Sequence, residues 1–263
     1  MKTGLTRRRL IQTSLATGAV AGLGNASQAQ DSTVHEGFPS QDRGKVYDTV
    51  LYAHSDLDKV TALVEGSPAL ANAAIDWGFG DWESALGAAA HMGFRDMADL
   101  LIRHGARPDL FTHAMLGHLD AVRSIVEAMP GIQSTYGPHG ITLLSHAKAG
   151  KEQAAAVVDY LETLGGADPK QDSAPLEIPI EGYAGAYSWG TGVDENVTVV
   201  QRNGIVALVR GEGFPRRLFH RGGHVFSPFG TGSLTVRFEV EGERAVSLSV
   251  WDPERFLTAR RVD

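Results

Sequence analysis

The chain has 263 residues, of which 43% are hydrophobic, and this composition is typical of a globular protein large enough for two modest domains. Its formal net charge is −7, and the charge becomes −11 without residues 1–29, which carry four Lys or Arg residues and no acid. An acidic surface argues against non-specific nucleic-acid binding and against docking on anionic lipid. The absence of cysteine excludes disulfides, thiol catalysis and zinc–thiolate sites.

The N-terminal segment is typical of an export signal. Residues Thr6–Ile11 (TRRRLI) resemble the twin-arginine export motif, and a weakly apolar stretch continues to Leu23. The small residues Ser27 and Ala29 predict cleavage before Gln30. An apolar run of about 14 residues is too short to span a bilayer, which needs about 20. We therefore expect a periplasmic or extracellular protein without a membrane span after signal removal; the alternative is an uncleaved anchor or a basic tail.

The middle of the chain repeats in the manner of paired helices. The segments Ser84–Gly93 (SALGAAAHMG) and Leu100–Ala106 (LLIRHGA) resemble the ankyrin unit, whose pattern runs T-P-L-H-x-A-A-x-x-G-H and later L-L-x-x-G-A. Partial copies lie within residues 46–63, 114–126 and 142–169. The resemblance covers residues 45–169 and implies a stack of helix pairs. The alternative is an unrelated array of helical hairpins.

Small residues in this pattern have clear physical roles. Paired alanines allow two helices to approach closely, and Gly93 and Gly117 are expected to turn the chain between helices because glycine tolerates left-handed dihedral angles. The sequence also departs from the family. Gly87 and Phe111 stand where the first consensus His is expected, and the last copy carries extra residues around 151–156.

The C-terminal third of the chain has the alternating pattern of β-strands. In residues 234–240 every second residue is apolar, and Asn203-Gly204 between two apolar runs predicts a hairpin. Seven or eight short strands in residues 180–263 predict an antiparallel β-barrel or β-sandwich. The opening segment Gly182–Tyr187 (GYAGAY) resembles the start of lipocalin-like domains appended to bacterial hydrolases of the β-lactamase type. The catalytic domain of those hydrolases is not present.

The predicted fold is therefore mixed and multi-domain, with an α-helical ankyrin-like repeat solenoid followed by a small antiparallel β domain. The predicted division in chain order is a twin-arginine signal at residues 1–29, a flexible lead at 30–44, ankyrin-like repeats at 45–169, a Pro-rich linker at 170–179 and the β domain at 180–263.

The segment Asp76–Glu83 (DWGFGDWE) is the most unusual in the repeats, with two tryptophans, two glycines and three carboxylates. Because ankyrin loops project over the concave groove, we expect this segment to form a recognition loop there. Tryptophan supplies rigid contact area and carboxylates supply charge selectivity. The predicted binding residues are Asp76, Trp77, Asp81, Trp82, Glu83, His91 and Phe111. In the alternative, the tryptophans cover the apolar stack, and Asp81 or Glu83 caps the following helix.

Histidines are frequent in the repeats, at positions 91, 113, 118, 139 and 146. His113 and His118 are five residues apart, which is not the i, i+4 spacing of a helical metal pair. We favour structural or solvated histidines over a metal or acid–base cluster. The sequence contains no hydrolase elbow, zinc-protease, P-loop or calcium-loop motif. No catalytic residue, metal ligand or cofactor is predicted.

These observations favour an exported binding protein whose ankyrin-like groove recognises another protein. One alternative is an enzyme with Asp81, Glu83 and His91 as acid–base groups in the groove. A second alternative is a carrier that holds a small apolar ligand inside the β domain. No nucleic-acid partner is expected.

Overall fold

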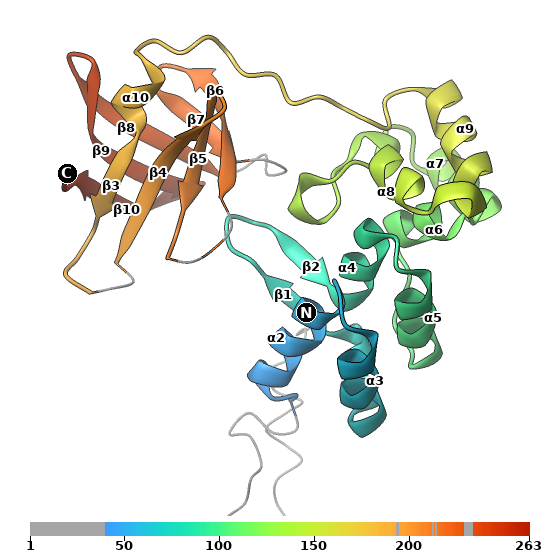
Figure 1. Ribbon diagram of the computed structural model, residues 1–263. Helices are drawn as coiled ribbons and strands as arrows, with labels where there is room; N and C mark the ends of the chain where they lie inside the picture. Colours follow the sequence, from blue (N-terminus) through green and yellow to red (C-terminus); the bar gives the residue numbers. More distant parts are fainter. Residues whose placement is uncertain (1–39, 193–194, 212, 214, 229–233) are drawn as a thin grey trace, which may run out of the picture. The chain divides into compact units, whose positions relative to one another are not determined.

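The computed structural model describes residues 40–263 apart from 193–194, 212, 214 and 229–233 (Figure 1). The predicted export signal lies outside the described residues, and so does most of the predicted lead. A helical region is followed by a closed antiparallel β-barrel, which confirms the predicted mixed fold. Among the helices within these ranges, none is long and apolar enough to cross a membrane.

Between residues 40 and 169 the structure shows four successive helix pairs, each joined by a short turn (Figure 1). The helices are α2 (Arg43–Tyr52) and α3 (Leu57–Gly66), α4 (Ala85–Met92) and α5 (Arg95–Arg103), α6 (Leu110–Leu116) and α7 (Leu119–Ala128), and α8 (Leu143–Ala149) and α9 (Ala155–Leu164). A two-stranded antiparallel hairpin of β1 (Ala74–Asp76) and β2 (Trp82–Ser84) separates the first pair from the second. Short 3₁₀ turns occupy Pro68–Asn72, Ile132–Ser134, Pro138–Gly140 and Lys151–Ala154.

Polar caps and left-handed glycines set the ends of these helices. The side-chain N-caps include Asp56, Ser84, Asp109 and Thr142, each of which accepts a hydrogen bond from the backbone N–H three residues later. Gly93 and Gly117 end α4 and α6 with φ angles of 70° and 76°, which confirms their predicted role as turn residues. The alternative in which Asp81 or Glu83 caps α4 is wrong, because Ser84 is the cap.

The core of the helical region is centred on α4. All residues of Ala85–Ala90 are buried, and α4 packs against α2, α5, α6 and α8. The small alanine and glycine residues of α4 leave room for other helices to approach closely from several sides. Leu101 of α5 and Leu161 of α9 are also buried.

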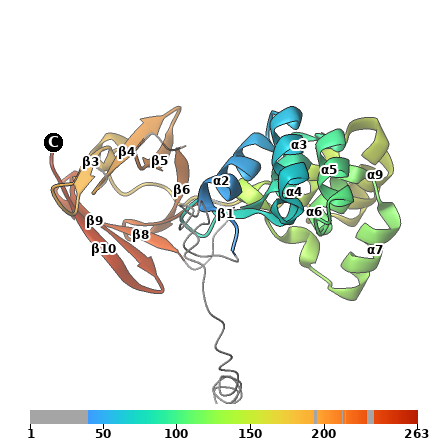
Figure 2. The same cartoon turned by 90° about the horizontal axis from the view of Figure 1, so that it is seen from below.

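The β domain is a closed barrel, so the barrel is correct and the sandwich alternative is wrong (Figure 2). Its strands are β3 (Gly185–Ser188), β4 (Asn196–Arg202), β5 (Ile205–Val209), β6 (Arg216–Gly222), β7 (Val225–Pro228), β8 (Thr235–Glu241), β9 (Arg244–Asp252) and β10 (Glu254–Arg261). Each strand pairs antiparallel with its neighbour in sequence, and β10 closes the ring on β3. Closure leaves no long unpaired sheet edge. The short helix α10 (Ile180–Tyr183) precedes the first strand.

Aromatic side chains fill the barrel interior. The rings of Tyr183, Phe226 and Phe238 lie 5.0–5.3 Å apart in edge-to-face contacts, and Tyr187 is also fully buried. Between β4 and β5, Asn203 and Gly204 have φ angles of 53° and 75°, as a tight two-residue hairpin turn requires. The hairpin predicted at this Asn-Gly pair is confirmed.

Part of the predicted linker contacts the barrel. The backbone N–H of Ala174 donates to the carbonyl of His220 on β6, and the side chains of Leu176 and Ile178 pack on the barrel core. The chain therefore joins the packing of the barrel several residues before the first strand.

The structure predicts a difference between two glycines that share a left-handed conformation. A Cβ at Gly117 would lie 2.1 Å from the carbonyl oxygen of Gln153, whereas a Cβ at Gly131 (φ 96°) meets nothing within 4 Å. We expect Gly117→Ala to lower the free energy of unfolding by about 1–3 kcal/mol more than Gly131→Ala, because only the first adds a steric clash to the backbone strain. Urea denaturation followed by circular dichroism measures both; equal losses would contradict this packing.

Candidate functional site

The β1–β2 hairpin places two neighbouring residues on opposite faces. Side chains alternate along a strand, and Trp82 is 65% exposed whereas Glu83 is 1% exposed. The pairs Ala74–Ser84 and Asp76–Trp82 fix the register of the hairpin. One face of β2 is therefore available to solvent, and the other carries a carboxylate into the protein.

Asp81 is held by a turn that is distant in the sequence. Its two carboxylate oxygens accept hydrogen bonds from the backbone N–H and the Nδ1 of His139, both at 2.8 Å. Burial acts to raise the pKa of Asp81, but the hydrogen bonds from His139 and from Arg216 outweigh it and lower the pKa to about 2. Asp81 is therefore an ionised anchor for the Pro138–Gly140 turn.

Glu83 is the buried centre of the site, and its side chain is fully inaccessible. One carboxylate oxygen lies 2.9 Å from Nε2 of His91 and 3.3 Å from Nε2 of His139. The other accepts a hydrogen bond from the indole N–H of Trp77 at 2.7 Å and lies 3.4 Å from Nε2 of His54. Burial opposes ionisation, but hydrogen bonds from His139, His54 and His91 lower the pKa of Glu83 well below its usual value.

Three histidines and Glu83 form a group that we name the His–Glu cluster: His54, Glu83, His91 and His139. One ligand atom from each residue lies within 4.8 Å of all the others. The histidines come from the turn after α2, from α4 and from the turn before α8, so the cluster joins three parts of the helical region. Three nitrogens and one oxygen at this spacing are a set of side chains that can hold a metal ion.

A groove of about 460 Å³ runs beside β2. We name it the Trp82 groove; residues that line it include Asp81, Trp82, Glu83, Phe111, Tyr136 and Pro138. Phe111 comes from α6 and Tyr136 precedes the Pro138–Gly140 turn, so three separate segments form its walls. Phe111, Tyr136 and Pro138 are half-buried, which leaves part of each available to a ligand.

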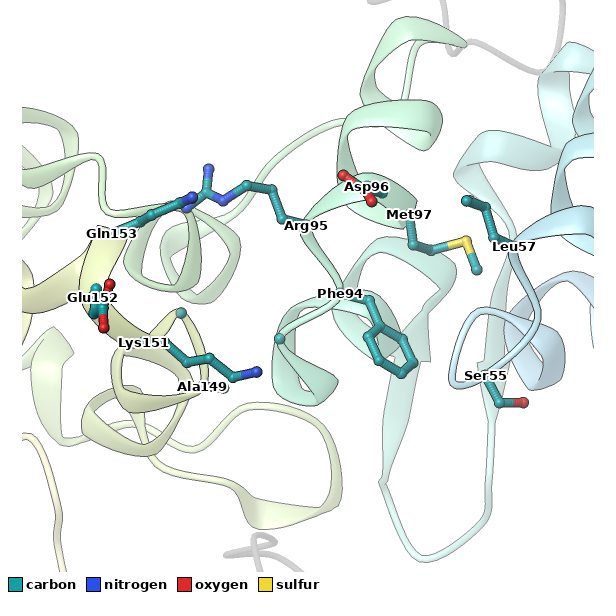
Figure 3. Close-up of a pocket in the computed structure, with 12 residues that line it drawn as sticks. Ser55, Leu57, Phe94, Arg95, Asp96, Met97, Ala149, Lys151, Glu152 and Gln153 are labelled. Atoms are coloured by element: carbon teal, nitrogen blue, oxygen red, sulfur yellow. The ribbon is translucent and has the colours of Figure 1, made fainter.

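A second pocket of about 650 Å³ lies at the turns between helices and is shown in Figure 3. Leu57, Phe94, Arg95 and Lys151 are among its lining residues, and none of the predicted binding residues lines it. The guanidinium of Arg95 donates to the carbonyl of Leu116, so this cation already serves the fold.

Five of the predicted binding residues lie at the Trp82 groove or in the His–Glu cluster. Asp81, Trp82, Glu83 and Phe111 line the Trp82 groove. His91 belongs to the His–Glu cluster instead.

The remaining two predicted residues have internal partners. Asp76 accepts from the N–H of Gly78 within the hairpin turn. Trp77 donates to Glu83, and its ring packs edge-on against Tyr47. Both hold the hairpin in place rather than line the groove.

His54, His139 and Tyr136 were not among the predicted site residues. Structural or solvated histidines were favoured, and two histidines fit that interpretation. His113 and His118 bring their Nδ1 atoms within 3.0 Å of each other across the α6–α7 turn. For His54 and His139, the available signal in the sequence was the number of histidines in one region. The contact between these two rings joins residues 85 positions apart, and no local sequence pattern predicts it.

No family model and no curated protein matches the chain. A solved structure described as the crystal structure of SurE is similar with a TM-score of 0.27 and 19% sequence identity, over 69% of this chain and 49% of that chain. The chain thus spans about half the length of that protein. A TM-score this low supports no argument about fold or function.

The charges of the site predict how stability depends on pH. Hydrogen bonds to Asp81 and Glu83 outweigh burial and raise the pKa of His139 from 6.5 to about 9. The stabilisation from protonated His139 is therefore complete below pH 6.5 and is lost as the pH rises through 9. With chelator present, we expect the melting temperature to fall between pH 6.5 and 9.5.

The matched control is His139→Asn, because asparagine tolerates the positive φ of 57° at this position. Its melting temperature should be lower at pH 6.5 and should change less up to pH 9.5. An equally steep alkaline fall in this variant would show that another group is responsible.

Proposed function

We propose that this is an exported binding protein whose Trp82 groove holds an extended, Lys- or Arg-rich segment of another protein. The observation that carries the proposal is the groove itself, because four predicted recognition residues line it: Asp81, Trp82, Glu83 and Phe111. Of the first three, Trp82 is exposed, whereas the side chains of Asp81 and Glu83 are buried. A groove of about 460 Å³ suits a few side chains of a peptide rather than a folded domain.

The aromatic walls of the groove support contact with long basic side chains. Trp82 exposes 65% of its surface, and the half-buried Phe111 and Tyr136 line the same groove. Arginine and lysine place their alkyl stems and charged heads against such rings, and each contact contributes about 0.5–1 kcal/mol at exposed sites. Exposed aromatic side chains that gather around one groove are typical of a binding surface.

The charge distribution favours a basic partner over an acidic one. Residues 40–169 hold nine Lys or Arg against 17 Asp or Glu, whereas residues 180–263 hold ten of each. The acidic excess of the chain is therefore concentrated in the helical region that contains the groove. The negative electrostatic potential of this acidic region speeds association with a cationic segment and slows association with an anionic one.

Two finer predictions belong to the same proposal. We infer that the helix pairs are ankyrin-like repeats, supported by their pairing and by the left-handed glycines Gly93 and Gly117 between paired helices. We also infer export through the twin-arginine route, supported by Arg7 and Arg8 in the N-terminal motif. Export would bring the groove into contact with partners outside the cytoplasm.

The other two functions have less support. In the acid–base enzyme alternative, Asp81 and Glu83 would exchange protons, but both carboxylates are committed to internal hydrogen bonds and have lowered pKa values. In the carrier alternative, an apolar ligand would occupy the barrel. The rings of Tyr183, Phe226 and Phe238 already contact one another in that interior.

The binding proposal predicts the effect of one exposed residue. We expect Trp82→Ala to weaken binding of a fluorescein-labelled Arg/Ala peptide of about ten residues by at least about tenfold, as removal of a central aromatic contact does. The free energy of unfolding should change by less than about 0.5 kcal/mol because the side chain is mostly exposed. Fluorescence anisotropy and thermal melts measure the two effects.

The matched control is Phe256→Ala, which removes another exposed ring (79% exposed) from the barrel strand β10. It should leave peptide affinity unchanged, and a Glu/Ala peptide should not bind the wild-type protein. If Phe256→Ala weakens binding as much as Trp82→Ala, or if both peptides bind equally, the groove is not the basic-peptide site.

A further inference from the structure

The His–Glu cluster brings its donor atoms together around the carboxylate of Glu83. Nε2 of His91 and of His139 lies 2.9 and 3.3 Å from one oxygen of Glu83, and Nε2 of His54 lies 3.4 Å from the other. In a tetrahedral site with metal–ligand bonds of about 2.0–2.1 Å, neighbouring donors are about 3.3 Å apart. The nitrogen–oxygen distances in the cluster are close to this value, and its four ligand atoms all lie within 4.8 Å of one another.

Two of the three histidines in the cluster have the outer hydrogen bonds that orient metal-binding histidines. Nδ1 of His54 faces the carbonyl oxygens of Val50 and Leu51 at 3.0 and 3.1 Å, so the N–H at Nδ1 is a donor and Nε2 is directed toward Glu83. Nδ1 of His139 donates to Asp81 at 2.8 Å in the same way. A carboxylate or carbonyl behind the imidazole fixes the tautomer that leaves Nε2 as the ligand.

We propose that the His–Glu cluster binds one divalent transition-metal ion through Nε2 of His54, His91 and His139 and a carboxylate oxygen of Glu83. Three imidazoles and one carboxylate suit zinc, cobalt, nickel or iron, whereas calcium and magnesium prefer sets of oxygen ligands. The ion replaces the protons that separate these groups and neutralises the buried charge of Glu83. Asp81 acts as a positioning residue for His139.

The ion also has a structural consequence for the Trp82 groove. Glu83 lies on β2, and His139 lies in the Pro138–Gly140 turn that forms part of the groove wall. A metal bound to both residues fixes the distance between these two segments. Because the bound ion stabilises only the folded state, saturation with metal raises the melting temperature.

Titration of chelator-treated full-length protein with Co²⁺ tests the proposal. We expect one ion per chain, a visible absorption spectrum typical of coordinated Co²⁺, and displacement of Co²⁺ by Zn²⁺. Affinity should fall by more than 100-fold in His91→Ala and in Glu83→Gln, and by about 10–100-fold in Asp81→Asn, which keeps the four ligands but loses the carboxylate that supports His139 and pairs with Arg216.

Two controls separate ligand loss from other effects. His113→Ala with His118→Ala removes the other close histidine pair and should leave the Co²⁺ affinity unchanged. Gly117→Ala lowers stability without touching the cluster and should still bind one ion per folded chain. The proposal is overturned if the wild-type chain binds no tighter than His91→Ala, or if binding is lost with His113 and His118 instead. Metal binding with unchanged peptide affinity leaves the site intact and separates it from the groove proposal.

Discussion

The burial of the Glu83 carboxylate is the constraint on which the rest of the site depends. Transfer of an unpaired carboxylate from water into a protein interior costs several kcal/mol, so its oxygens must find donors or a cation. Trp77, His54, His91 and His139 meet that need from four different positions in the chain. One buried charge therefore holds the first helix pair, the hairpin, the second helix pair and the turn before α8 together.

This arrangement explains the composition of the Asp76–Glu83 segment. Gly78 and Gly80, with φ angles of 85° and 76°, allow a turn short enough to bring Trp77 back over Glu83. Trp77 then contributes its indole N–H to the buried carboxylate, while Trp82 faces outward. The two tryptophans look alike in the sequence, but one stabilises the hairpin and the other provides the contact surface.

Local rules predicted most helix ends and the barrel strands, but not the two short strands of the β1–β2 hairpin, where a loop was expected. The αL glycines at 93 and 117, the Ser84 region at the start of a helix and the Asn203-Gly204 hairpin follow from backbone preferences that act over a few residues. The alternation after residue 180 predicted the strands but not closure. Closure depends on pairing between β3 and β10, more than 70 residues apart, which no local pattern specifies.

The candidate site was predicted mainly where it lies on one continuous segment. Asp81, Trp82 and Glu83 were identified because an unusual loop interrupts the repeats, and His91 and Phe111 were added from the neighbouring repeat units. His54 and His139 were not, because their contacts with Glu83 form only after the helix pairs have packed. A charged residue next to the N-cap of a buried helix was a usable signal. Glu83 precedes Ser84 and α4, so it enters the core with that helix.

On β2 the side chains of Trp82 and Glu83 project in opposite directions, Trp82 toward solvent and Glu83 into the His–Glu cluster. Strand β2 has three residues. Its register with β1 is defined by the pair Ile75–Glu83 and by one further residue pair on each side of it. A slip of one residue would turn Glu83 toward solvent and Trp82 toward the histidines, since side-chain direction alternates along a strand. The donors around Glu83 therefore specify the register that exposes Trp82. Any ligand that strengthens the cluster also fixes the orientation of the aromatic ring on the other face.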